Sequence, residues 1–301
     1  MNDTDDNDAI RHYTAADGAT LAYRRSTPEA PADGPALVLL HGAASNGTRW
    51  WHFVDHCALR ENTRLLRPDL RGHGASVWRG PARMTHWVDD LVALLDHEGI
   101  ERAVVLGHCL GANIALHFAA RYARRCAGLV LVEPMLRPAL RGPLARIRRI
   151  APLLDALARL AGLCNRIGMR RRRLRQVDLR ALDQPVHEAR RRGEAVDDAL
   201  RVHGSLRHDL GVVPTGQLLA NFVELMREPA VDAVRSPSLV LQSSGTGMTD
   251  AALTARRLAS LPDADFVELP AEHWIPAAYP ERLCELVEQW WAGAMRSSHP
   301  G

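Results

Sequence analysis

Hydrophobic positions along the chain form short continuous runs that alternate with longer stripes at helical spacing. Continuous runs of Val and Leu are typical of strands that are buried on both faces of a parallel sheet. The runs predict six strands, over Ala36–His41, Thr63–Pro68, Ala103–His108, Ala127–Glu133, Pro237–Gln242 and Ala264–Leu269.

Helical stripes separate these runs. Over Thr85–His97 the apolar residues Trp87, Leu91 and Leu94 share one face, and Gly99 follows as a stop signal. Further helices are expected over Leu110–Tyr122, Ala251–Leu261 and Pro280–Met295. The alternation of strands and helices predicts an α/β fold with a doubly wound, mostly parallel sheet and right-handed crossovers.

This alternation stops over residues 137–229, which are helical by pattern and poor in strands. A compact domain rarely contains so long a connection without structure of its own. We therefore interpret this stretch as a helical cap inserted between two strands. The predicted organisation is a disordered acidic tail over residues 1–10, an α/β core over residues 11–136 and 230–296, and the cap.

Composition narrows the class of protein. With 301 residues, 47% of them hydrophobic, the chain can bury a core without disulfides. Five scattered cysteines indicate a reducing compartment. The chain contains no apolar run of the ~18 residues that a membrane span needs. The acidic first residues contain no apolar segment typical of a signal peptide. We expect a cytoplasmic protein.

The basic residues are concentrated in the predicted cap. The net charge is only +3, and all 38 basic residues are arginines, which indicates a GC-rich, bacterial coding bias. Two interpretations of the cap arginines stay open: a solvated face, or a docking patch for a carrier protein, a coenzyme A phosphate or a substrate carboxylate. The patch would comprise Arg146, Arg148, Arg149 and Arg170–Arg173. Aromatic residues do not interleave with these arginines, so nucleic acid is not an expected partner.

The strongest chemical signal is the sequence Gly107-His-Cys109-Leu-Gly111 between a predicted buried strand and a predicted helix. A tight strand-to-helix turn strains the central residue and leaves no room for side chains two positions to either side. Such a turn lifts the Cys109 side chain above the sheet edge and directs the Leu110 amide to the same place. The helix N-terminus favours a thiolate and an oxyanion there. The alternative for Cys109 is a small buried core residue.

This pattern resembles the nucleophile elbow of the α/β-hydrolase superfamily, with Cys109 where serine usually stands. Two further motifs strengthen the resemblance: His41-Gly-Ala-Ala44, which is similar to the family's oxyanion loop, and Asp69-Leu-Arg-Gly-His-Gly-Ala-Ser76, which is similar to a second conserved turn. The resemblance implies that the amides of Ala43 and Leu110 form the oxyanion hole.

The resemblance also implies the general base. The segment Glu272-His273-Trp274 follows the last predicted strand, where the family places its catalytic histidine, although Glu272 replaces the usual glycine. His273 would take the thiol proton, or form a thiolate–imidazolium pair, and later protonate the leaving group.

Two residues compete for the third position, the acid that orients the imidazole. Asp250 lies slightly beyond the place where the family usually supplies an aspartate, and it is also a plausible helix N-cap. Glu133 ends an earlier predicted strand, where some family members place their acid. A Cys–His pair without an acid is a third option, because a thiol has a free pKa of ~8.5 and needs less activation than a hydroxyl.

The cap should cover the pocket at the carboxyl ends of the strands. Candidate walls are Trp50, Trp51, Leu136 and Met248, although both tryptophans also suit core packing. Apolar walls favour an acyl or aryl substrate, free or as a coenzyme A or carrier-protein thioester. No metal site or cofactor is expected, because neither a metal-ligand spacing nor a phosphate-binding glycine loop was found.

We therefore expect a cysteine hydrolase that cleaves an ester, lactone or thioester through an acyl-enzyme. The alternative is an acyltransferase or cyclase with the same residues, in which an alcohol, amine or thiol replaces water. A non-catalytic binding protein on the same fold, and a carbon–carbon bond hydrolase, are less favoured, the first because both Cys109 and His273 are present and the second because those relatives normally use serine.

Overall fold

A twisted sheet forms the centre of the computed structural model, which describes residues 8–28, 34–78, 80–169, 174–245 and 247–297. Its strand order is β1-β2-β4-β3-β5-β6-β7-β8. The pairs from β4 to β8 are parallel, whereas β1–β2 and β2–β4 are antiparallel. The strands are β1 Arg11–Thr14, β2 Thr20–Ser26, β3 Ala36–Leu40, β4 Leu65–Pro68, β5 Ala103–His108, β6 Cys126–Val132, β7 Ser238–Ser243 and β8 Ala264–Leu269.

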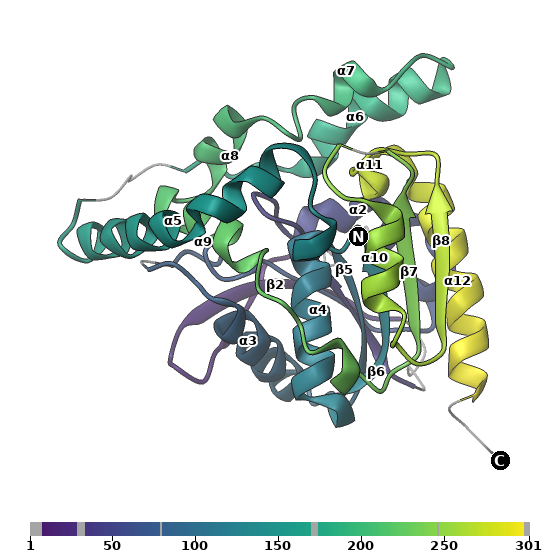
Figure 1. Ribbon diagram of the computed structural model, residues 1–301. Helices are drawn as coiled ribbons and strands as arrows, with labels where there is room; N and C mark the ends of the chain where they lie inside the picture. Colours follow the sequence, from purple (N-terminus) through teal and green to yellow (C-terminus); the bar gives the residue numbers. More distant parts are fainter. Residues whose placement is uncertain (1–7, 29–33, 79, 170–173, 246, 298–301) are drawn as a thin grey trace.

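Helices cover both faces of this sheet (Figure 1). The α-helices of the core are α2 Trp51–His56, α3 Met84–His97, α4 Leu110–Arg121, α10 Ala251–Leu258, α11 Ile275–Ala278 and α12 Pro280–Ser297. Short 3₁₀ helices are η1 Gly47–Trp50, η2 Ala58–Glu61, η3 Ala123–Arg125, η4 Arg137–Ala139 and η5 Val231–Ala233.

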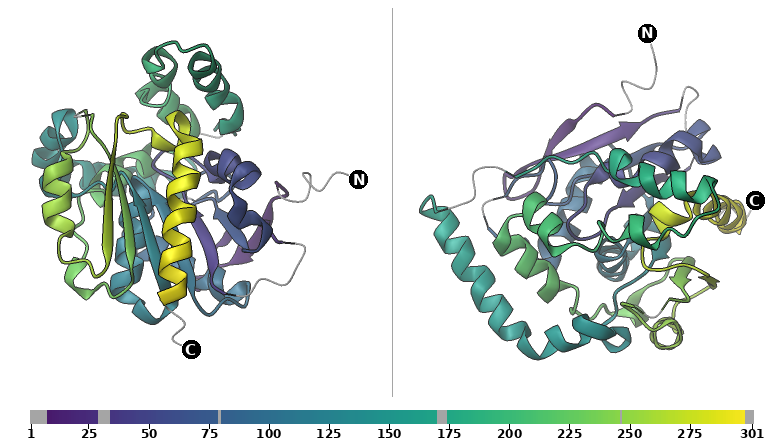
Figure 2. Two further views of the ribbon diagram at one scale, coloured as in Figure 1. Left: turned by 90° about the vertical axis from the view of Figure 1, so that its right-hand side faces the viewer. Right: turned by 90° about the horizontal axis from the view of Figure 1, so that it is seen from above.

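The core has two apolar layers because successive strand residues point to opposite faces. In β3, Val38 and Leu40 pack in the layer that contains residues of α3, α4 and α10. Leu37 and Leu39 pack in the opposite layer, with residues of α2 and α12. Figure 2 shows strands of the sheet lying between α10 and α12 in its left view. Residues buried on both sides explain the continuous apolar runs in the sequence.

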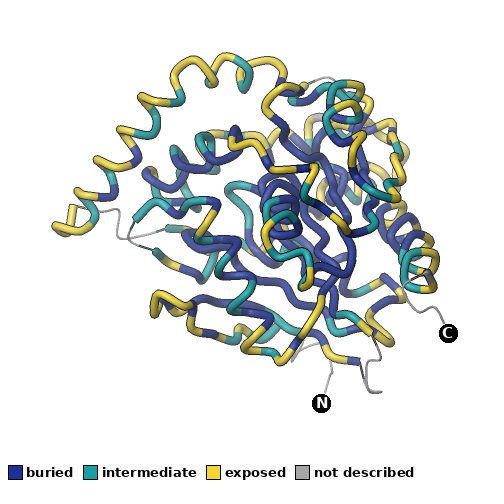
Figure 3. Tube along the Cα trace, turned by 60° about the horizontal axis from the view of Figure 1, so that its bottom comes forward, coloured by how far each residue is buried: buried dark blue, intermediate teal, exposed yellow. Residues whose placement is uncertain are grey.

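Helices of the predicted cap lie between β6 and β7 in the chain and beyond the carboxyl ends of the strands (Figure 1). They are α5 Gly142–Arg166, α6 Leu179–Arg191, α7 Asp197–Leu200, α8 Leu206–Val212 and α9 Thr215–Glu224. The long helix α5 packs mainly on α9 and buries only Ala158 and Gly162. Its outer side is exposed along much of its length (Figure 3), including Ile150, Leu153, Leu157, Leu160 and Leu163.

The expected α/β architecture is confirmed, and the six expected strands are present with end shifts of one or two residues at most. The hairpin of β1 and β2 was not predicted, because β1 is short and both strands are only partly apolar. Most of the predicted acidic tail, residues 1–7, lies outside the described residues, as do Arg170–Arg173. Asp8 is described and forms ion pairs with Arg67 and Arg180. Among the helices of the described ranges, none combines the length and the apolar character needed to cross a membrane.

Candidate active site

Cys109 occupies the sharp turn between β5 and α4. Its backbone angles are φ 54° and ψ −114°, a strained conformation for a residue with a side chain. A Cβ atom on Gly107 would collide with the backbone of Gly111, and one on Gly111 would collide with the carbonyl of Leu40. Both glycines are therefore required for the elbow to pack against β3, as the sequence pattern predicted.

Two backbone segments border the Cys109 side chain. Leu110 is the first residue of α4, so its N–H has no carbonyl partner within the helix. On the other side, a Cβ on Gly42 would lie 3.3 Å from the Cβ of Cys109, which places the His41–Ala44 loop directly against the elbow. Ala43 is half-buried and packs against the apolar layer that contains Cys109. The two candidate oxyanion residues thus come from segments adjoining the elbow.

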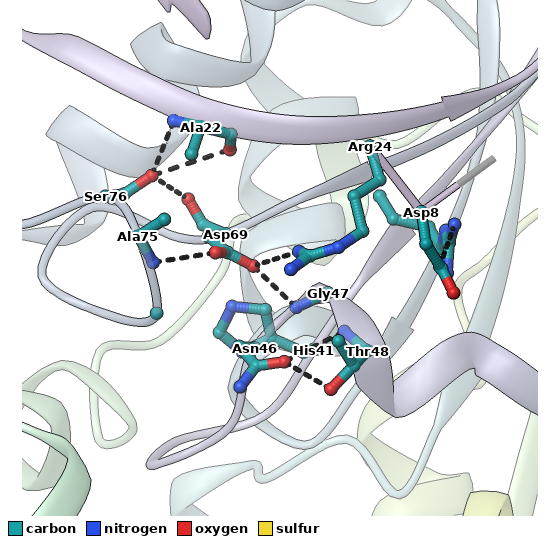
Figure 4. Close-up of polar contacts among 12 residues, drawn as sticks. Asp8, Ala22, Arg24, His41, Asn46, Gly47, Thr48, Asp69, Ala75 and Ser76 are labelled. Carbon is teal, nitrogen blue, oxygen red and sulfur yellow. Dashed lines mark hydrogen bonds and ion pairs between the residues drawn. The ribbon is translucent and has the colours of Figure 1, made fainter. Parts of the chain in front are cut away.

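Asp69 fixes the loop that follows β3 (Figure 4). Its carboxylate accepts hydrogen bonds from the amides of Gly47 at 2.7 Å and Ala75 at 2.8 Å, and Arg24 pairs with it at 3.3 Å. Ser76 donates to the Asp69 carbonyl at 2.6 Å and accepts from the amide of Ala22. The second motif of the sequence is therefore a brace that joins β2, the turn after β4 and the loop that carries Ala43.

The imidazole of His273 meets a carboxylate from another strand end. Its Nδ1–H donates to Oε2 of Glu133 at 3.1 Å. Both side chains are buried, Glu133 at 1% exposure and His273 at 5%, while Cys109 retains 8%. Burial strengthens this ion pair because little water screens it.

Charges around His273 keep its ring protonated. Burial by itself would lower the pKa of His273, but the charge and hydrogen bond of Cys109, followed by those of Glu133, raise this pKa to about 10. The ring thus lies between the Cys109 side chain and the Glu133 carboxylate. This arrangement can hold a thiolate and an imidazolium together at neutral pH.

Glu133 is held by further contacts in the turn after β6. Its Oε1 accepts from the amide of Ser243, and its Oε2 accepts from the hydroxyl of Thr249 at 3.4 Å. The residue has a positive φ of 52°, which is rare for a residue with a long side chain. The strained turn and these donors direct the carboxylate toward His273.

Asp250, the alternative candidate for the acid, binds groups other than His273. It caps α10 by accepting from the amide of Leu253 at 2.8 Å, and it forms an ion pair with Arg141. The sequence left Asp250 and Glu133 equally open. The structure puts Glu133, not Asp250, beside His273, with the Glu133 carboxylate 3.1 Å from Nδ1 of His273.

Two polar residues in the elbow have positioning contacts that the sequence did not reveal. His108 donates from Nε2 to the backbone carbonyl of His273 at 3.0 Å, and burial lowers the pKa of His108 well below its usual value. Asn113 binds both the amide and the carbonyl of Met135, each at 2.9 Å. The elbow thus holds the histidine loop on one side and the segment after Glu133 on the other.

A buried ion pair joins the core to the predicted cap. Arg49 in η1 binds Asp183 in α6 through its Nη1 at 2.7 Å and 3.0 Å, and it contacts Nδ1 of His203 at 3.1 Å. The ring of Trp274, the neighbour of His273, lies 5.4 Å from that of His203. This pair was not predicted, because its members are distant in sequence.

The four proposed substrate-wall residues lie in different parts of the structure. Leu136 is buried and Met248 half-buried, and both pack with the layer that contains Cys109. Trp50 is 1% exposed and packs edge-on against Phe53 in the opposite layer, so its assignment as a wall is wrong and its core alternative holds. Trp51 lines a separate surface cavity next to α6 and α12 and donates to Asp183 at 3.0 Å.

A family comparison agrees with the elbow and the fold. Residues 35–277, more than half of the chain, match the model of the alpha/beta hydrolase fold. The chain therefore belongs to the alpha/beta hydrolase fold family.

Individual relatives match shorter segments. Lipase LipV of Mycobacterium tuberculosis is 39% identical over 102 residues, which are 34% of this chain and 38% of the lipase. The bifunctional esterase/perhydrolase DCH of Acinetobacter calcoaceticus is 32% identical over 113 residues, or 37% of this chain and 39% of that protein. The chain thus matches well under half the length of these curated relatives.

A solved structure extends the likeness of fold to almost the whole chain. A thermophilic esterase from Thermogutta terrifontis superposes with a TM-score of 0.65 at 22% identity, covering 95% of this chain and 99% of the esterase. At this level of identity the similarity concerns the fold.

Proposed function

We propose that the protein is a cysteine hydrolase that cleaves an ester, lactone or thioester through an acyl-enzyme. One observation carries the proposal: the His273 side chain hydrogen-bonds both Cys109 and the Glu133 carboxylate, so nucleophile, base and acid are in contact. The lipase and the esterase/perhydrolase among its relatives support an ester-like substrate.

The first half-reaction follows from this charge arrangement. The Cys109 thiolate attacks the acyl carbon, and the amides of Leu110 and Ala43 stabilise the developing oxyanion. His273 transfers its proton to the leaving alkoxide or thiolate, and the carbon–oxygen or carbon–sulfur bond breaks. The products of this step are a Cys109 thioester, the protonated leaving group and a neutral imidazole.

The second half-reaction uses the same ring as a base. Once Cys109 is acylated, its negative charge no longer raises the pKa of His273, so the neutral imidazole is favoured. His273 then takes a proton from water, whose oxygen attacks the thioester carbonyl. The acid leaves, the thiolate returns, and the proton remains on His273 beside Glu133.

Acyl transfer is the second candidate, and the burial of the site favours it. Cys109 and His273 expose only 8% and 5% of their surfaces, and a site with little water lets an alcohol, amine or thiol compete for the acyl-enzyme. The same atoms would react, with the acceptor in place of water.

Turnover of p-nitrophenyl esters tests the proposal. The unmodified chain should release p-nitrophenol, and Cys109→Ala should abolish release. Cys164→Ala is the matched control, because Cys164 is a half-buried cysteine in α5. Loss of turnover in the control, or full turnover in Cys109→Ala, would contradict the proposed nucleophile. Product analysis with added alcohol then separates transfer from hydrolysis.

A further inference from the structure

Three side chains that are distant in sequence converge where α6 meets the core. They are His52 on α2, His187 on α6 and Glu281 on α12. One nitrogen of each imidazole and one carboxylate oxygen lie within 4.8 Å of one another, and Nε2 of His52 is 3.7 Å from Oε1 of Glu281. The cluster lines a surface cavity of about 520 Å³ and shares no residue with the candidate active site.

Both imidazoles have unused bonding capacity. Nδ1 of His52 and Nε2 of His187 are buried and have no hydrogen-bond partner among the described residues. A buried polar atom without a partner is costly and calls for an explanation, such as an ion or a ligand. The His52 and His187 rings lie 5.6 Å apart between centroids. His52 faces Glu281 through its other nitrogen, Nε2, at 3.7 Å, so Nε2 is the His52 atom that can share a ligand with Glu281.

The local charges suit a cation with nitrogen and oxygen ligands. Two imidazoles supply nitrogen ligands, and the neutral imidazole is the form that binds metals. The negative charges of the Asp183 and Glu281 carboxylates lie close enough to interact electrostatically with both rings, which favours a cation there.

Positive groups also face the cluster. Nη1 of Arg190 lies 3.9 Å from Oε2 of Glu281, and Arg191 acts on His187. The guanidinium of Arg190 rests 4.4 Å from the Tyr279 ring and donates to the carbonyl of Ala278. Arg190 is therefore held at the C-terminal end of α11. The Oε1 atom of Glu281 still faces His52. His56 stacks on His52 and donates its Nδ1–H to the His52 carbonyl.

We propose that His52, His187 and Glu281 form a binding site for a divalent transition-metal ion, for which Zn²⁺ is the best fit. Two imidazole nitrogens and one carboxylate oxygen are a typical zinc ligand set, with a fourth position left for water. Ligand atoms lie about 2.0–2.2 Å from zinc, so the present spacing must contract on binding. Glu281 can supply that movement because its side chain is 56% exposed.

The ion would act as a cross-link between three elements. It would join α6 of the predicted cap to α2 and α12 of the core, next to the Arg49–Asp183 ion pair. A ligand that binds only the folded arrangement stabilises it. The site therefore predicts a zinc-dependent rise in thermal stability that does not depend on turnover.

Zinc titration of the full-length chain tests this site. The background is Cys109→Ala, because the Cys109 thiol beside His273 is itself a potential zinc ligand. ZnCl2 is titrated by calorimetry into this background and into the same chain with Glu281→Gln, His187→Ala or His208→Ala. Glu281→Gln removes the charged ligand from an exposed position, so it should not disturb folding. His208→Ala is the matched control, a half-buried histidine on α8 outside the cluster.

We expect one zinc ion per chain in the background and in His208→Ala, with a higher melting temperature when zinc is present. Glu281→Gln and His187→Ala should each weaken binding at least about tenfold and remove the rise in melting temperature. Binding of equal affinity in all four proteins, or the absence of any binding in the background, would overturn the proposal.

Discussion

Nδ1 of His273 donates to Oε2 of Glu133 across 3.1 Å, although the two residues follow strands that are not neighbours. Glu133 follows β6 and His273 follows β8, with β7 between them. The carboxylate reaches the ring because the turn at Glu133 has a positive φ and the amide of Ser243, at the end of β7, binds its other oxygen.

Removal of the negative charge from each candidate acid should affect turnover very differently. Glu133→Gln leaves the volume unchanged but removes the charge beside His273, so kcat/KM should fall by about 10²–10⁴-fold. Asp250→Asn should leave kcat/KM near the value of the unmodified chain, since its partners are Arg141 and the amide of Leu253. Ester turnover by both variants measures this difference. A greater loss in Asp250→Asn would reverse the assignment.

The protonation of His273 should persist well above neutral pH. Because the pKa is raised to about 10, the ring should carry its proton at pH 8 and lose it only as the pH rises through about 10. The imidazole resonances in a pH titration by NMR report this directly. In Cys109→Ala the pKa should fall, because Cys109 is the largest of the groups that raise it; an unchanged titration would remove Cys109 as its cause.

The elbow glycines should not tolerate a methyl group. Gly111→Ala should destabilise the protein by about 1–3 kcal/mol or more, because the added Cβ collides with the Leu40 carbonyl. Gly293→Ala in α12 is the control: its Cβ would meet nothing within 4 Å, and alanine should stabilise the helix by about 0.5–1 kcal/mol. Urea unfolding compares the two variants. Similar effects at both positions would argue against a tight elbow.

The buried ion pair between η1 and α6 should be strongly coupled. Arg49→Met or Asp183→Asn leaves one buried partner without its counterpart, which should cost about 3–5 kcal/mol of unfolding free energy. The double variant should lose less than the sum of the single losses. A double-mutant cycle by urea unfolding measures the coupling, and additive losses would mean that the contact contributes little.

Local patterns were sufficient to predict much of the fold and the elbow. Strands such as β3 are buried on both faces, so their apolar runs are continuous. The glycine spacing around Cys109 is a local pattern, although Gly111 is required by its contact with Leu40 of the neighbouring strand. The β1–β2 hairpin was not predicted because both strands mix polar and apolar residues and β1 is a short strand at the sheet edge.

Contacts between distant segments could not be predicted in the same way. The choice between Glu133 and Asp250 depends on which strand end lies next to the loop of His273. Trp50 follows the His41–Ala44 loop in sequence, yet η1 turns it into the layer with Phe53. The spacing of His52, His187 and Glu281 matches no metal motif, because each residue comes from a different helix.

Trapping of the acyl-enzyme tests the central claim most directly. The protein is mixed with p-nitrophenyl acetate, quenched in acid and examined by intact mass and peptide mapping. We expect one acetyl group on the peptide that contains Cys109, attached as a thioester that hydroxylamine removes, and none in Cys109→Ala. An acetyl group on a different residue, with turnover preserved in Cys109→Ala, would contradict the account.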